Sequence, residues 1–181
     1  VYSLAMCADL YLRTHAPDLK FEVYGSDVDE KSVAFGKNGV YQRNDIKEVP
    51  VPYLEGHWAR GTGEIAEYVK VKKELRSCCT FSRENLFELS ASIKSRTYDI
   101  IFCRNVFIYF DQKQITEIVH SLLNVLSPSG YLFVGISESL RALDLPLNSP
   151  GPSIYTKSTA KSEKAISKQT ASDNVVSISQ P

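Results

Sequence analysis

Polar side chains follow the clearest buried strand that the sequence predicts. The segment YDIIFCRNVFIYFD runs from Tyr98 to Asp111 and places Arg104, Asn105 and Tyr109 among apolar residues, just past the strand. In an open α/β sheet, ligands bind outside the carboxyl ends of the strands. A cation, an amide and a phenol at such an end indicate a binding site. Arg104 and Asn105 could instead satisfy loop carbonyls, and Tyr109 could be a core aromatic residue.

Candidate binding residues also follow the other predicted strands. They are Asp27 after FEVYGSD, Asn85 and Leu86 after the strand at Cys79–Ser82, and Ser137 and Glu138 after GYLFVGIS. Each has a simpler alternative, since Asp27 could cap a helix, Asn85 could form a turn and Glu138 could be solvated. The four strand ends nevertheless meet at one edge of one sheet, where a carboxylate suits ribose hydroxyls and amide groups suit an adenine edge. The pattern favours a nucleoside-containing cofactor.

Motifs for other chemistries are missing from the sequence. It has no GxGxxG, GxxxxGK[ST] or GxSxG, and the RGTG at Arg60–Gly63 precedes an alternating strand instead of a helix. The four cysteines form no CxxC and share no ligand spacing with the three histidines, so we expect reduced cytosolic thiols and no metal site. None of His15, His57 and His120 lies at a predicted strand end, so a Ser or Cys nucleophile would lack a base.

Predicted strands and helices alternate along the chain. The elements are a helix within 1–16, a strand at Phe21–Asp27, a helix capped by Asp29 and ending near Gly36, strands at YVKVK and Cys79–Ser82, a strand at Tyr98–Cys103, a helix that begins at Asp111 with a capping box to Gln114, a strand at Gly130–Ser137 and a short strand at SIYTK. Residues 40–60 look irregular because Pro50 and Pro52 interrupt them. This alternation indicates an α/β fold around a mostly parallel sheet, with residues 58–81 as a small antiparallel β insertion.

The composition is that of a globular protein. Its 181 residues are 43% hydrophobic and 23% charged, and 21 basic residues balance 21 acidic ones. This balance argues against a broad nucleic-acid-binding surface, and the longest apolar stretches are too short to cross a membrane. Residues 158–181 are rich in Ser, Lys, Thr and Ala and contain no aromatic residue. We therefore predict a domain at 1–157 followed by a disordered tail or linker at 158–181.

An ordered series of motifs carries a family resemblance. The segment CRNVFIYFD, with FEVYGSDVDE upstream and SPSGYLFVGISESL downstream, resembles the S-adenosylmethionine-dependent glutamate methyltransferases of bacterial chemotaxis, the CheR family. VYSLAM looks like the end of the family's first cofactor motif, and GVY, RGTG and FSRENLFE follow in the family's order. The resemblance covers about residues 1–157 and implies a Rossmann-like class I methyltransferase fold with a small antiparallel β insertion, in a cytoplasmic signal-transduction protein.

The resemblance also implies a role for each candidate residue. These roles are Asp27 at the ribose of S-adenosylmethionine, Asn85 and Leu86 around the adenine, Arg104 and Asn105 along the cofactor cleft, and Tyr109 close to the reactive methyl. The implied partners are methyl-accepting chemotaxis receptors, with no nucleic acid and no direct membrane insertion. In some members of the family the β insertion docks a short peptide from the receptor's C-terminus, a role that stays open for this chain.

The sequence departs from the family pattern at three places. SPSG replaces a PGG-like turn, and Ile136 stands where many members have His. The family's first strand, its acidic cofactor loop and its N-terminal helical domain do not occur in the sequence, which does not begin with Met. Because that first strand lies in the middle of the family's sheet, we expect this chain to be a fragment that is unstable or inactive alone.

The implied reaction moves a methyl group from a sulfonium to the γ-carboxylate of a receptor glutamate. A carboxylate with an ordinary pKa of about 4.3 is ionised at neutral pH, so positioning and the exclusion of water suffice without a strong general base. Two alternatives stay open: a binding or regulatory module that keeps the fold without turnover, and a class I methyltransferase with a small-molecule or nucleic-acid substrate. A dinucleotide oxidoreductase is least favoured because its glycine fingerprint is missing.

Overall fold

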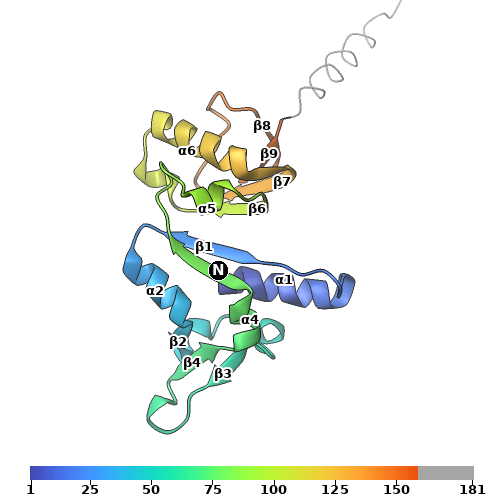
Figure 1. Ribbon diagram of the computed structural model, residues 1–181, viewed down its shortest axis with the longest axis vertical. Helices are drawn as coiled ribbons and strands as arrows, with labels where there is room; N and C mark the ends of the chain where they lie inside the picture. The colour runs from blue at the N-terminus through green and yellow to red at the C-terminus, as the bar shows by residue number, and fades with distance from the viewer. Residues whose placement is uncertain (159–181) are drawn as a thin grey trace, which may run out of the picture. The chain divides into compact units, whose positions relative to one another are not determined.

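The computed structural model describes residues 1–158, which form two compact units (Figure 1). Unit 1 is Val1–Asn85, and unit 2 begins at Leu86. All but the first residue of the tail predicted at 158–181 lies outside the described residues. The domain boundaries at 1–157 and 58–81 stay predictions, and each unit is described here by itself.

Unit 1 contains a parallel strand pair and a small antiparallel sheet. In chain order its helices and strands are α1 (Tyr2–His15), β1 (Val23–Asp27), α2 (Glu30–Asn38), β2 (Val40–Gln42), the 3-10 helix η1 (Arg43–Ile46), α3 (Val51–Leu54), β3 (Trp58–Arg60), the 3-10 helix η2 (Gly63–Ile65), β4 (Tyr68–Val71), α4 (Lys73–Ser77) and β5 (Cys79–Arg83). β1 pairs in parallel with β5, so that Val23 lies opposite Cys79 and Asp27 opposite Arg83. The predicted strands at both places are confirmed.

The ends of α2 follow from local chemistry, as the sequence predicted. The Asp29 carboxylate accepts hydrogen bonds from the backbone N–H groups of Lys31 and Ser32, which have no partner inside the helix. Gly39 ends the helix with φ +65°, a left-handed conformation that glycine adopts without steric cost. The helix runs two residues past the predicted end at Gly36.

The antiparallel sheet of unit 1 has the order β2-β4-β3. Along β4, Val69 and Val71 are buried while Tyr68 and Lys70 are exposed, which confirms the strand with one wet face. The prediction that residues 40–60 are irregular was wrong, because β2, α3 and β3 lie within them. Both strands are three residues long and exist through pairing with β4, a long-range contact that local periodicity does not report.

Unit 2 is built on a four-stranded sheet with the order β6-β7-β9-β8. Its elements are α5 (Ala91–Lys94), β6 (Tyr98–Cys103), the 3-10 helix η3 (Phe107–Tyr109), α6 (Gln112–Val125), β7 (Leu126–Val134), β8 (Leu147–Gly151) and β9 (Ile154–Lys157). β6 and β7 are parallel, whereas β9 is antiparallel to both β7 and β8. β7 begins four residues before the predicted strand at Gly130, because SPSG continues the strand instead of forming a turn.

Helix α6 and strand β7 supply most of the core of unit 2. Asp111 and Gln114 form the predicted capping box, with each side chain accepting from the other residue's backbone N–H. The apolar face of α6 and the inner face of β7 are buried together: Ile118, Val119, Leu122, Leu123, Leu126, Leu132 and Val134. Each such side chain contributes roughly 1.5–3 kcal/mol when it leaves water, so this contact holds the sheet and helix together.

One face of β6 is more exposed than the sequence predicted. Ile100 and Phe102 are 55% and 43% exposed, whereas Cys103 is buried, so the predicted buried strand is buried on one face only. Phe102 stacks on Phe133 of the parallel neighbour at 4.6 Å between ring centroids. Because side chains alternate between the two faces of a strand, Ile100 and Phe102 lie on one face. Ile101 and Cys103 lie on the other face, which packs with α6.

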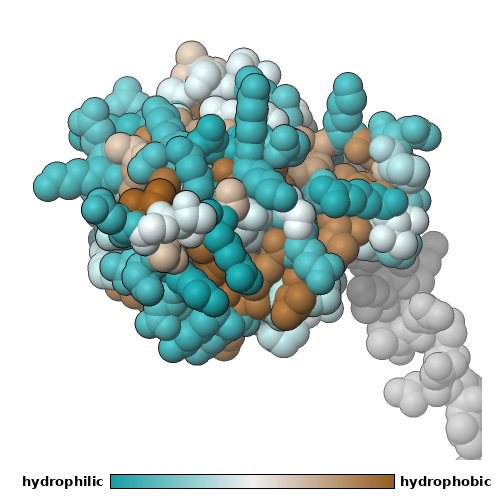
Figure 2. All heavy atoms as spheres, turned by 90° about the horizontal axis from the view of Figure 1, so that it is seen from below, coloured by the Kyte–Doolittle hydropathy of each residue, from teal (hydrophilic) through white to brown (hydrophobic). Residues whose placement is uncertain are grey.

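The surface mixes polar and apolar side chains. The face in Figure 2 is mainly hydrophilic, with smaller hydrophobic patches between the polar side chains, as the balanced charge composition leads one to expect. Within residues 1–158 no helix is long and apolar enough to span a bilayer.

Candidate functional site

Asp27 stands at the carboxyl end of β1 in unit 1, as predicted. Its Oδ1 accepts the backbone N–H of Asp29 at 2.9 Å, and the residue is exposed. The helix cap is Asp29, whose pKa is lowered mainly by the hydrogen bond from the backbone of Ser32. Asp27 therefore does shape the turn through Oδ1, while the residue as a whole stays exposed.

Asn85 and Leu86 follow β5, the parallel partner of β1. The backbone N–H of Glu84 donates to the carbonyl of Asp27 at 3.0 Å, which extends the pairing of the two strands by one residue. Asn85 is exposed directly after it, so Asp27 and Asn85 share one end of the strand pair. Leu86 begins unit 2 and is half-buried against that unit's core, so part of its side chain already has a packing role.

Arg104 and Asn105 follow β6 in unit 2. Arg104 is exposed and lines a hollow of about 200 Å³ together with Phe102, Phe133 and Ser153. Asn105 has φ +59°, the left-handed conformation that Asn tolerates better than most residues. The polar residues expected at this strand end are thus present on its surface, and the chain turns sharply at Asn105.

Tyr109 ends the 3-10 helix η3 and is 76% exposed. Its backbone N–H donates to the carbonyl of Val106 at 3.3 Å. The alternative of a core aromatic residue is wrong for Tyr109, because Phe107 occupies that place and is 4% exposed. An exposed phenol on a short ordered helix can meet a ligand or a partner.

Glu138 follows β7, as the sequence predicted, but the sequence predicted neither its burial nor its hydrogen-bond partners. It stands four residues past β7 and is 6% exposed, so the interpretation of a solvated residue was wrong. Its carboxylate accepts hydrogen bonds from the backbone N–H groups of Asn105, Phe107 and Gly135. The sequence places Glu138 more than thirty residues from Asn105, and no local signal connects the two.

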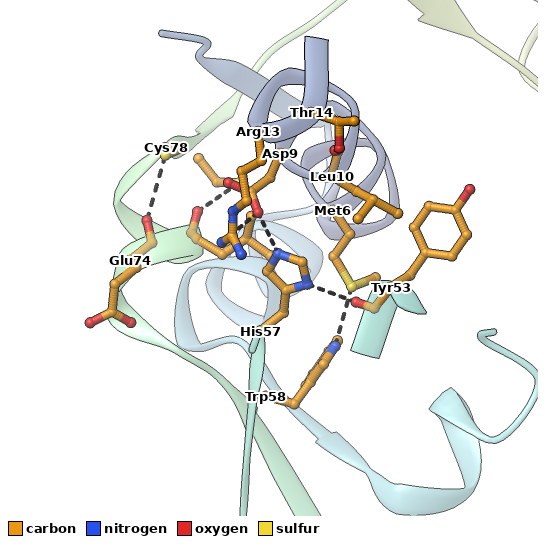
Figure 3. A network of polar contacts seen from close by, with 12 residues as sticks. Met6, Asp9, Leu10, Arg13, Thr14, Tyr53, His57, Trp58, Glu74 and Cys78 are labelled. Carbon is orange, nitrogen blue, oxygen red and sulfur yellow. Dashed lines mark hydrogen bonds and ion pairs between the residues drawn. The ribbon is translucent and has the colours of Figure 1, made fainter. Parts of the chain in front are cut away.

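A second polar cluster lies in unit 1 and was also missed (Figure 3). His57 is 3% exposed; its Nδ1 lies 2.8 Å from the carbonyl oxygen of Tyr53 and its Nε2 lies 2.7 Å from Oδ2 of Asp9. Both ring nitrogens therefore lie within hydrogen-bond distance of an oxygen atom. Arg13 reaches the same Asp9 oxygen at 2.6 Å. This cluster ties α1 to the segment between α3 and β3.

Burial makes two of the four cysteines, Cys79 and Cys103, poor nucleophiles. All four are free thiols, and burial raises the pKa of Cys103 to about 12, with the charge of Glu138 as the smaller cause. Burial likewise raises the pKa of Cys79 to about 11. Thiols with such values stay protonated near neutral pH, so neither would act as a nucleophile. Residues 1–158 also contain no cluster of His, Cys, Asp and Glu that could hold a metal ion.

The residues present fit a nucleoside cofactor. Asp27 offers a charged acceptor at the end of a parallel strand, which is the group that binds ribose hydroxyls in open α/β sheets. Asn85 offers both a donor and an acceptor at the same end of that strand pair.

Comparison with known proteins points to one family. Residues 1–149 match the family described as "CheR methyltransferase, SAM binding domain". The chain is 34% identical over 157 residues to the "Chemotaxis protein methyltransferase" of Escherichia coli strain K12, a match that covers 87% of this chain and 54% of that protein. It is 33% identical to "Chemotaxis protein methyltransferase 2" of Pseudomonas aeruginosa PAO1, with 86% and 54% covered. The corresponding protein of Salmonella typhimurium LT2 is 32% identical, with 78% and 49% covered. The chain spans about half the length of these relatives.

Proposed function

Because the chain belongs to the CheR methyltransferase family, within its S-adenosylmethionine-binding domain, we propose that it forms part of an enzyme that methylates glutamate side chains of chemotaxis receptors. The products would be glutamyl methyl esters, and the enzyme would act in the cytoplasm. The observation that carries the proposal is the exposed, oriented carboxylate of Asp27 at the end of the β1-β5 pair, in a chain of this family.

The proposed roles follow the chemistry of each side chain. Asp27 would accept hydrogen bonds from the ribose hydroxyls, and Asn85 and Leu86 would hold the adenine edge and face. Arg104 and Asn105 would line the cofactor cleft, and Tyr109 would lie near the methyl group and orient the reactants. When bound, S-adenosylmethionine supplies an electrophilic methyl group on its sulfonium.

The site needs no strong base for this reaction. The acceptor carboxylate of a glutamate is already ionised at neutral pH, so the chain's residues need only hold the reactants in line and exclude water. Two groups that could act as bases are both buried. His57 contacts Asp9 and Tyr53, and the thiol of Cys103 stays protonated. Methyl-accepting receptors are the proposed partners, and docking of a receptor peptide at the sheet β2-β4-β3 is a further part of the proposal.

The experiment is a calorimetric titration of S-adenosylhomocysteine into the full-length protein. We expect the wild type to bind and Asp27→Asn to bind roughly tenfold or more weakly, because a hydrogen bond to a charged group is worth about 1.5–3 kcal/mol. Asp18→Asn is the matched control, since Asp18 is an exposed acid of unit 1 away from the strand end.

Two results would count against the proposal. A folded wild-type protein that does not bind would favour a non-catalytic module that only keeps the fold. Binding that is equally weakened by Asp18→Asn and Asp27→Asn would refute the assignment of the ribose site to Asp27.

A further inference from the structure

Three backbone N–H groups converge on one buried carboxylate in unit 2. Oε2 of Glu138 accepts from Asn105 at 2.9 Å and from Gly135 at 2.5 Å, and Oε1 accepts from Phe107 at 2.7 Å. Asn105 and Phe107 lie in the loop that follows β6, whereas Gly135 follows β7. A single side chain therefore joins the loops at the ends of two parallel strands.

The buried carboxylate of Glu138 depends on these three backbone N–H groups. A buried carboxylate is costly unless hydrogen bonds replace its lost water, and among residues 1–158 no Lys, Arg or His forms an ion pair with it. The three N–H dipoles are thus what stabilises the charge. Because charge-assisted hydrogen bonds are short and strong, they hold the loop in one conformation.

The surroundings of Glu138 are built to keep it in place. Its own backbone N–H donates to the carbonyl of Gly135 at 3.0 Å, and the hydroxyl of Ser153 donates to the same carbonyl at 3.1 Å. Leu140 donates its N–H to the hydroxyl of Tyr155 on β9. A Cβ at Gly135 would lie 2.5 Å from Oε2 of Glu138 and 2.8 Å from the side-chain oxygen of Asn105, so only glycine permits this approach.

The loop that Glu138 holds is the one that carries the candidate cofactor residues of unit 2. Asn105 is itself bound to Glu138, Arg104 precedes it, and Phe107 begins the 3-10 helix that ends at Tyr109. The left-handed conformation of Asn105 depends on its surroundings, because such backbone geometry is sparsely populated in free chains.

We propose that Glu138 is a positioning residue that fixes the loop Arg104–Tyr109 in its cofactor-binding conformation through its bonds to the N–H groups of Asn105 and Phe107. This inference rests on the proposed function and deepens it, since it names a residue that acts on the cofactor through the loop without touching it. Replacing a residue with a purely structural role would lower the stability of the protein alone. Replacing a positioning residue also lowers cofactor affinity by more than the loss of stability explains.

The test compares Glu138→Gln, Glu138→Asp and Ile118→Val in the full-length protein. Glutamine has the same shape, but its amide nitrogen would face a backbone N–H donor, so one of the two loop contacts becomes repulsive. Ile118 is fully buried on α6, and its loss of a methylene lowers stability without removing any of the three hydrogen bonds to Glu138. The readouts are the midpoint of thermal unfolding and the affinity for S-adenosylhomocysteine.

We expect Glu138→Gln to weaken binding of S-adenosylhomocysteine roughly 10- to 100-fold, and Glu138→Asp, which keeps the charge, to recover part of that loss. Ile118→Val should bind as the wild type does while its unfolding midpoint falls. If Glu138→Gln does not fold, Glu138→Asp carries the test with an intermediate loss of affinity.

The outcomes separate this inference from the proposed function. A folded wild type that does not bind overturns the proposed function. A wild type that binds, together with folded Glu138 variants that bind within about twofold of it, overturns the role of Glu138. Equal losses of affinity in Ile118→Val and Glu138→Gln would also overturn it, because affinity would then follow stability alone.

Discussion

The Asp9 carboxylate has two side-chain partners of very different burial, and this contrast yields a quantitative prediction. His57 is 3% exposed and Arg13 is 61% exposed by side chain, yet both lie within hydrogen-bond distance of the same Oδ2. The two distances are 2.7 Å and 2.6 Å. Distance alone would rank the partners as equal, whereas burial predicts that only His57 matters for the stability of unit 1.

The expected magnitudes follow from the contacts. Replacing His57 with Ala removes a charge-assisted hydrogen bond to Asp9 and a hydrogen bond to the carbonyl of Tyr53, and it opens a cavity. We expect a loss of about 3 kcal/mol in the free energy of unfolding. The pair Asp9–Arg13 is an exposed contact four residues apart on α1, so Arg13→Ala should cost less than about 0.5 kcal/mol.

A double-mutant cycle isolates the contact itself. Asp9→Ala, His57→Ala and the double variant give the coupling between the two side chains, which we expect to be about 1–3 kcal/mol. Arg13→Ala in the same cycle with Asp9→Ala is the matched control, with a coupling below about 0.5 kcal/mol.

Trp58 provides the signal for this measurement. It is the single tryptophan of the chain, it lies in unit 1, and its Nε1 donates to the sulfur of Met6 on α1 at 3.3 Å. Urea unfolding followed by tryptophan fluorescence therefore uses a probe that lies in unit 1 and contacts α1. A coupling for Asp9 and His57 no larger than that for Asp9 and Arg13 would refute the argument that burial decides the strength of the two contacts.

Two further predictions concern unit 2. Tyr109→Phe should leave the unfolding midpoint unchanged, because its side chain is 76% exposed, but should slow methyl transfer by roughly tenfold or more; a tritium transfer assay with receptor substrate checks this, and an unchanged rate would remove Tyr109 from the site. The pKa of Cys103 rises from the usual 9.0 to about 12 through burial, so the folded state keeps a proton that the unfolded state loses. The stability that Cys103 contributes is therefore fully present below about pH 9 and is lost as pH rises toward 12, with a slope of up to about 1.4 kcal/mol per pH unit. Urea unfolding followed by circular dichroism between pH 8 and 10.5 should show a shallower decline of stability for Cys103→Ala than for the wild type, and equal slopes would contradict the burial argument.

The sequence by itself determined the features that depend on near neighbours. Asp29 caps α2, Gly39 ends it, and Asp111 with Gln114 begins α6, because each device joins backbone and side-chain groups within four residues. The alternation along Tyr68–Val71 specified a strand with one wet face for the same reason. Asp27, Arg104 and Tyr109 could be proposed as site residues because strand ends and family motifs are recognised from short stretches of sequence.

Only the tertiary structure decided the features that join distant segments. The strands β2 and β3 exist through pairing with β4, and their own three residues carry too little pattern to predict them. Glu138 contacts Asn105 across 33 sequence positions, and His57 contacts Asp9 across 48. In both pairs one side chain is buried, so the hydrogen bond joins two distant segments inside the fold. A residue's type limits which hydrogen bonds it can make, but burial and the choice of partner come from the packing of the whole chain.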